Sequence, residues 1–128
     1  MCIRDRNKPS DLVLSALVRA RYCELLAPKV PHGESDLFLV GLLSLMDSIL
    51  QIPMGVVLEG INLDRETRAV LLGQKSQLGP IYQLMLSQEA ADWPKVSELC
   101  AQLRLPESLA STCHWQAMQW AREMTAGV

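Results

Sequence analysis

Residues 37–50 read LFLVGLLSLMDSIL, and this stretch decides the fold class because apolar side chains occupy almost every position around a helix. A helix that is apolar around its whole circumference must be surrounded by other helices. We therefore expect a central core helix that starts at residues 34–36 and runs to about Gln51. Its most apolar part, residues 37–46, is about half as long as a membrane-spanning helix needs to be, so no membrane insertion is predicted.

Further helices are predicted on both sides of this segment. Before it, an apolar stripe over residues 14–25 recurs every three or four positions, with Ser10 as its expected N-cap and Pro28 ending the helix. After it, Met54–Glu59 supplies one or two turns, and longer helices are expected over residues 64–72, 76–91, 92–103 and 105–124. Asp64 and Ser76 are the expected caps of the first two of these. No segment alternates as strands do, so the sequence predicts an all-α, compact multi-helix bundle.

The composition, net charge and cysteine spacing exclude several classes of protein. Of 128 residues, 49% are hydrophobic and 20% charged, which supports a packed core rather than disorder. The formal net charge is −2, so no basic field exists to hold a nucleic-acid backbone. Cys2, Cys23, Cys100 and Cys113 form no CxxC pair, and we interpret them as thiols of a reducing cytoplasm rather than as metal ligands or disulfides.

No group of residues in the sequence has the types and spacing of a catalytic or metal-binding site. His32 lies in a Pro-Gly loop, and His114 has no ligand-type partner one helical turn away. Cys113 and His114 are adjacent, but neighbouring helical residues point about a hundred degrees apart and cannot form a nucleophile–base pair. Glu34 and Asp36 stand at a helix start, where negative charge complements the helix dipole. We therefore predict no catalytic residue, no metal site and no cofactor.

Two arginines and three tryptophans are the other candidates for a binding surface. Arg19 and Arg21 are balanced by acidic neighbours and are interpreted as a solvated helix face. Trp93 opens a helix and is expected to plug a junction between two helices. Trp115 and Trp120 are five residues apart and face different directions, so one is expected to pack and the other to lie at an interface.

The first six residues, MCIRDR, have no apolar period and resemble translated adapter sequence. We expect residues 1–6 to be an artefactual extension and residues 7–128 to be the C-terminal part of a helical domain. A domain that lacks its first helices exposes apolar surface, so marginal stability or aggregation is predicted for this chain alone.

Several segments together resemble the HDOD domain of bacterial EAL-HDOD signalling proteins. Residues 16–27, ALVRARYCELLA, are similar to the "RARFCELLA" helix of that family, and residues 38–47, FLVGLLSLMD, to its "FLLGLLSLLD" helix. Leu71-Leu72-Gly73, Leu78-Gly79 and Asp92-Trp93 fit the later part of the pattern. The likeness covers roughly residues 13–124, and the order and spacing of its pieces make it fairly specific.

HDOD domains are similar to HD-type phosphohydrolases, whose "GLLHDIGK" segment carries a metal-binding His-Asp pair. Aligned on Gly41-Leu42-Leu43, that pair falls at Ser44 and Leu45. Leucine offers no lone pair, and a serine hydroxyl is a poor metal ligand without negative charge nearby. The resemblance therefore implies a non-enzymatic, cytoplasmic regulatory module with a protein partner and, upstream in the same chain, an EAL domain linked to cyclic di-GMP.

Two alternatives stay open beside that interpretation. The first is a degenerate HD-like domain that binds a nucleotide or another small-molecule signal. The second is a helical scaffold unrelated to HD proteins.

Overall fold

The computed structural model describes residues 9–33 and 35–126, and within these ranges it holds helices and turns but no strand. The all-α prediction is thus confirmed, whereas the six-residue extension lies outside the described residues. The elements in chain order are α1 (Pro9–Leu26), the 3-10 helix η2 (Ala27–Lys29), α2 (Leu37–Leu43), α3 (Met46–Leu50), α4 (Met54–Val57), α5 (Arg65–Leu71), α6 (Gly79–Glu89), α7 (Trp93–Leu103) and α8 (Glu107–Thr125).

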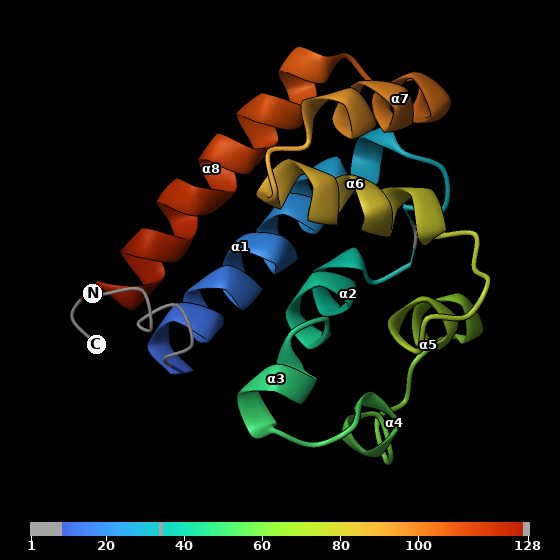
Figure 1. Ribbon diagram of the computed structural model, residues 1–128, viewed down its shortest axis with the longest axis vertical. Coiled ribbons are helices and arrows are strands. Elements are labelled where there is room, and N and C mark those ends of the chain that lie inside the picture. Colours follow the sequence, from blue (N-terminus) through green and yellow to red (C-terminus); the bar gives the residue numbers. More distant parts are fainter. Residues whose placement is uncertain (1–8, 34, 127–128) are drawn as a thin grey trace.

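Helix α1 is the centre of the bundle (Figure 1). Its most extensive contacts are with α2 and α8, and α6 also lies against it while packing on α7. Both α1 and α8 carry alanines that are almost completely buried, among them Ala16, Ala20, Ala117 and Ala121. Short side chains of this kind allow two helix axes to approach closely, so α8 lies along α1 over much of its length (Figure 1).

The crossing of α1 and α2 is closer still. A Cβ atom on Gly41 would lie 2.4 Å from the carbonyl carbon and oxygen of Arg19 and 2.6 Å from the nitrogen of Ala20. These are backbone atoms that cannot rotate away. Glycine is therefore required at position 41 because the two helix backbones occupy the space of any side chain.

The predicted core helix is not continuous, and this expectation was wrong. Helix α2 ends at Leu43, and α3 begins at Met46 after a break at Ser44 and Leu45. The Ser44 hydroxyl donates a hydrogen bond of 2.6 Å to the Gly41 carbonyl, and the backbone of Leu45 leaves the helical region at φ −112° and ψ 2°. A serine that bonds to a preceding carbonyl competes with the helical ladder and bends the chain.

Local capping signals place most other helix starts. The carboxylates of three aspartates each accept a hydrogen bond from the backbone N–H three residues later, which satisfies a donor that the helix itself leaves free. The pairs are Asp36–Leu39, Asp64–Thr67 and Asp92–Lys95. Helix α5 ends before Gly73, whose φ of 78° is the left-handed conformation expected there.

Two predicted caps are not helix caps. Ser10 lies inside α1, which the structure describes from Pro9 onward. Helix α6 begins at Gly79, three residues after Ser76, and no side chain caps it. The Ser76 hydroxyl instead accepts the N–H of Leu78 at 3.1 Å and shapes the turn before the helix. Pro80 falls in the first turn of α6, where its missing N–H is not needed, as predicted.

Burial is uneven along the apolar segments. Core side chains from α1, α2 and α4–α8 form one cluster, in which Leu26, Leu84 and Leu58 at the end of α4 are completely buried. By contrast, Leu50, Ile52 and Val56 expose 53%, 38% and 47% of their surface. We call residues 50–56 the α3–α4 corner. Within the described part of the chain, no helix is long and apolar enough to cross a bilayer.

Candidate functional site

Ser44 and Leu45, the positions that align with a metal-binding pair, lie at the break between α2 and α3. Ser44 is 7% exposed, and its hydroxyl oxygen accepts a hydrogen bond of 3.0 Å from Arg19 Nη1 while it donates to the Gly41 carbonyl. The oxygen is thus held between two protein groups. A guanidinium at this distance also repels a metal cation, so this arrangement opposes metal binding at Ser44.

Arg19 connects three helices through one guanidinium. Its Nε and Nη2 donate to Oε2 and Oε1 of Glu89 at 3.0 and 2.6 Å, and its Nη1 reaches Ser44. The arginine side chain is only 12% exposed, so the expectation of a solvated position was wrong for this residue. A two-point contact between a guanidinium and a carboxylate fixes geometry as well as charge. We call Arg19, Ser44 and Glu89 the α1–α2–α6 network.

Arg21 behaves differently from Arg19 although it lies only two residues away. Its guanidinium pairs with Glu24 at 2.6 Å on the same helix and lies 5.6 Å from the ring centroid of Trp120. About a third of the Arg21 side chain is exposed. The predicted position on a helix surface is therefore right for Arg21.

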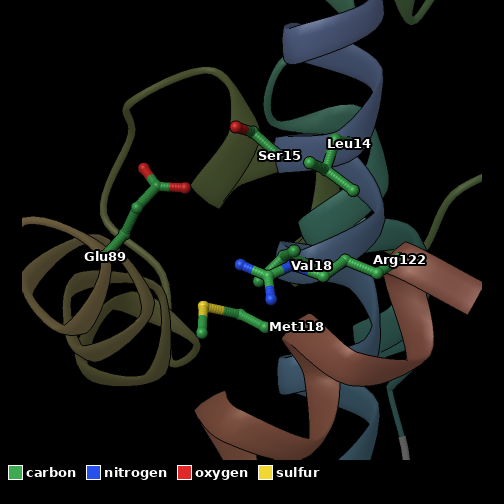
Figure 2. A pocket seen from close by; sticks show the side chains of 6 residues that line it. All are labelled: Leu14, Ser15, Val18, Glu89, Met118 and Arg122. Atoms are coloured by element: carbon green, nitrogen blue, oxygen red, sulfur yellow. The ribbon is translucent and has the colours of Figure 1, made fainter.

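A cavity of about 190 Å³ opens beside the network, between α1, α6 and α8. Its walls come from the side chains of Leu14, Ser15, Val18, Glu89, Met118 and Arg122. Figure 2 shows the side chains of Glu89 and Arg122 entering from opposite sides, with Leu14 and Val18 on the wall formed by α1. Glu89 belongs both to this cavity and to the α1–α2–α6 network.

The two histidines are far from forming a metal site. The rings of His114 on α8 and Tyr22 meet edge to face, with centroids 5.8 Å apart, and His114 is half-buried. Burial lowers the pKa of His114, although the negative charge of Glu89 acts in the opposite direction. His32 lies in a turn with φ of 65°. In the described part of the chain, no three histidine, cysteine, aspartate or glutamate side chains gather closely enough to bind a metal ion.

His32 also borders a shallow surface hollow with Glu66, Lys75, Ser76 and Gln77. The carboxylate of Glu66 already accepts hydrogen bonds from the Gln77 backbone at 2.7 Å and from the Ser76 hydroxyl at 3.0 Å. These hydrogen bonds lower the pKa of Glu66, that from Gln77 being the largest cause. Glu66 is therefore occupied in holding the turn before α6.

The described cysteines are buried thiols, and Cys2 lies outside the described residues. Cys23, Cys100 and Cys113 are all free, and Cys23 is completely buried. Burial raises the pKa of Cys23 to about 12, which keeps the thiol protonated and chemically inert. Tyr22 is buried beside them, and desolvation raises the pKa of its hydroxyl far above the usual range. That hydroxyl has no hydrogen-bond partner among the described residues.

On α8 one tryptophan packs as predicted and the other is exposed, and the interface expected for the exposed one stays a prediction. Trp120 packs against Phe38 with ring centroids 6.2 Å apart, whereas Trp115 is 58% exposed. Trp93 is 55% exposed, so the expectation that it plugs a helix junction was wrong. Asp92 caps the start of α7, where its side chain accepts a hydrogen bond from the Lys95 backbone N–H.

The fold and this network define an all-helical domain, and comparisons with known proteins add a biological context. The chain is 29% identical to YuxH, an uncharacterized protein of Bacillus subtilis, over 122 residues that cover 94% of this chain and 29% of YuxH. It is 27% identical to the cyclic di-GMP phosphodiesterase CdgJ of Vibrio cholerae over 121 residues, which cover 92% of this chain and 28% of CdgJ.

The chain thus spans less than a third of the length of these two relatives. No family model matches it, and no solved structure does. The comparisons therefore establish distant homology to a cyclic di-GMP phosphodiesterase.

Sequence reasoning missed the α1–α2–α6 network and the cavity beside it. Arg19 and Glu89 are 70 residues apart, and no pattern in the sequence pairs them. The usable signal was the apolar stripe on both sides of Arg19, since a charge on the buried face of a helix requires a partner from another element.

Proposed function

We propose that this chain is a non-catalytic regulatory module of the HDOD type within a cyclic di-GMP signalling protein. The observation that carries the proposal is the hydrogen bonding of the Ser44 hydroxyl. At the position where an HD phosphohydrolase has a metal-binding histidine, this chain has a hydroxyl bonded to the Gly41 carbonyl and to the Arg19 guanidinium. A positive side chain there stabilises the helix crossing and works against a divalent cation.

The homology to a cyclic di-GMP phosphodiesterase supports the signalling part of the proposal. A module without chemistry of its own acts through the domains or proteins that it contacts. We therefore propose that it regulates an attached EAL domain or a separate protein partner, and that it works in the cytoplasm.

The first experiment tests regulation in cis. Long-read sequencing across the codons for residues 1–7 provides the source gene, and the encoded protein is compared with a version that lacks residues 7–128. We expect the rate of cyclic di-GMP hydrolysis to change when the module is removed. Equal rates and equal partner binding for the two versions would contradict a regulatory role.

The second experiment tests the absence of catalysis. The chain is incubated with bis(p-nitrophenyl) phosphate and with cyclic di-GMP in the presence of Mn²⁺, Ni²⁺ or Mg²⁺. We expect no turnover and no stoichiometric metal. Hydrolysis that disappears on chelation would overturn the proposal.

The ligand-binding alternative has the cavity beside Glu89 in its favour. Its volume of about 190 Å³ is below the usual range for drug-sized ligands, about 300–1,000 Å³. We therefore expect no cyclic dinucleotide to bind in this cavity, and we expect thermal-shift measurements with cyclic di-GMP to give a flat response.

A further inference from the structure

The cavity between α1, α6 and α8 has the composition of a binding site for a small molecule. Leu14, Val18 and Met118 supply apolar walls, Ser15 supplies a hydroxyl, and Glu89 and Arg122 supply opposite charges. Apolar walls with a few convergent polar groups are the usual composition of such sites. Glu89 and Arg122 approach from opposite sides (Figure 2), so a carboxylate paired with Arg19 lines one end of the cavity and a guanidinium lines the other.

The carboxylate of Glu89 is held in a fixed geometry. Arg19 binds each oxygen of the Glu89 carboxylate once, at 3.0 and 2.6 Å. A carboxylate offers about four acceptor positions, so acceptor capacity remains on both oxygens. The Glu89 side chain is 35% exposed beside the cavity, whereas Arg19 behind it is 12% exposed. Arg19 therefore fixes the carboxylate, and the remaining acceptor positions are open to a ligand.

The position of Glu89 on its helix also favours a cationic group. It is the last residue of α6, where the helix dipole places partial negative charge. The cationic end of the cavity is Arg122 in the last turn of α8, an exposed side chain whose guanidinium reaches inward (Figure 2). A guanidinium binds carboxylates through two parallel hydrogen bonds.

We infer that this cavity binds a compact zwitterion with an apolar body, of the class of apolar α-amino acids. Its ammonium group contacts Glu89, its carboxylate contacts Arg122, and its side chain lies against Leu14, Val18 and Met118. The size agrees with this class: a cavity of about 150 Å³ holds benzene, and this one is somewhat larger. The inference concerns a site separate from any phosphodiesterase domain and holds whether or not the module regulates one.

The test is an NMR and calorimetric titration of the whole chain with L-leucine and two analogues. N-acetyl-L-leucine lacks the cationic group, and L-leucinamide lacks the carboxylate. We expect leucine to bind most tightly and each analogue to bind about tenfold more weakly, the usual loss for one charge-assisted contact. Chemical-shift changes are expected on α1, the end of α6 and the second half of α8.

Variants separate a specific site from general apolar binding. Arg122→Gln is expected to weaken leucine binding about tenfold while leaving leucinamide binding unchanged, because leucinamide has no carboxylate to lose. Arg65→Gln is the matched control, since Arg65 is also exposed but lies on α5 outside the cavity. Circular dichroism establishes that both variants are folded.

Three results would overturn the inference. They are equal binding of leucine and its two analogues, no binding of leucine at tens of millimolar, and an Arg122→Gln variant that binds leucine as the parent chain does. The titration uses neither cyclic di-GMP nor a phosphodiesterase, so its failure would leave the regulatory proposal standing.

Discussion

Helix α2, which crosses α1, and the α3–α4 corner are neighbours in the sequence, but their apolar side chains differ in how closely they are packed. At the crossing, Gly41 brings two backbones into contact, and a largely buried arginine ties α1 to α2 and α6. At the corner, Leu50, Ile52 and Val56 are all more than a third exposed. Apolar side chains therefore differ in burial between these two regions: those at the crossing are packed, whereas three at the corner are largely exposed.

The largest effect is expected from Gly41→Ala. The added methyl group would meet the Arg19 backbone at 2.4 Å, so α1 and α2 must move apart. Overpacking usually costs about 1–3 kcal/mol, and rigid backbone neighbours place this site at about 3 kcal/mol or more. Urea denaturation measures the loss of unfolding free energy.

Gly55→Ala is the matched control for that substitution. Gly55 belongs to the short helix α4, and a Cβ there has no neighbour within 4 Å. We expect no loss of stability, or a gain of about 0.5 kcal/mol, because alanine restricts the unfolded chain. Similar losses for both variants would remove the distinction between the crossing and the corner.

The second-largest loss of stability is expected from Arg19→Met, which keeps a long side chain but removes its positive charge. The substitution leaves Glu89 without its guanidinium and Ser44 without its donor, and we expect a loss of about 2 kcal/mol. The comparison is Arg21→Met, which breaks a partly exposed pair with Glu24 and is expected to cost about 0.5 kcal/mol. Thermal and urea denaturation of both variants test the difference, and equal losses would show that the network contributes no more than a surface pair.

A smaller effect is the pH dependence contributed by His114. Burial holds its folded-state pKa below the ordinary value of 6.5, so the unfolded chain binds more protons in that range. Stability is therefore full above about pH 6.5 and falls as the pH drops toward the folded-state pKa. His114→Gln should flatten this part of the profile. A parent profile that is flat between pH 7.5 and 5.5 would contradict the burial argument.

The smallest effect on stability is expected at the corner itself. Leu50→Gln and Val56→Gln replace exposed apolar side chains, and such changes usually alter stability by about 0.5 kcal/mol or less. Urea denaturation should place both variants close to the parent chain. A loss above 2 kcal/mol would mean that the corner is part of the packed core.

The elements that the sequence predicts well are those governed by local chemistry. Asp36, Asp64 and Asp92 begin helices where expected, because a cap acts within three residues. The break at Ser44 and Leu45 could not be seen, since neither proline nor glycine marks it. Its cause is a hydroxyl contact whose partners include an arginine from another helix.

The candidate site was harder to predict than the fold for the same reason. The guanidinium of Arg19 and the carboxylate of Glu89 meet only after α1 and α6 have packed. Local sequence around each describes an ordinary charged helix residue. The exposed indole of Trp93 shows the converse error, because a large aromatic side chain at a helix start indicated burial that tertiary packing does not provide.

The buried thiols can be used to follow the opening of individual helices. Cys23 lies on α1, Cys100 on α7 and Cys113 on α8, and all three are free. A sulfur that is shielded and protonated reacts with alkylating reagents only during moments when its helix is released. The labelling rate of each cysteine, measured by mass spectrometry, therefore reports how often the helix that carries it opens. Equal rates would describe one cooperative unit, and faster labelling at Cys100 would describe a bundle whose α7 detaches before its centre.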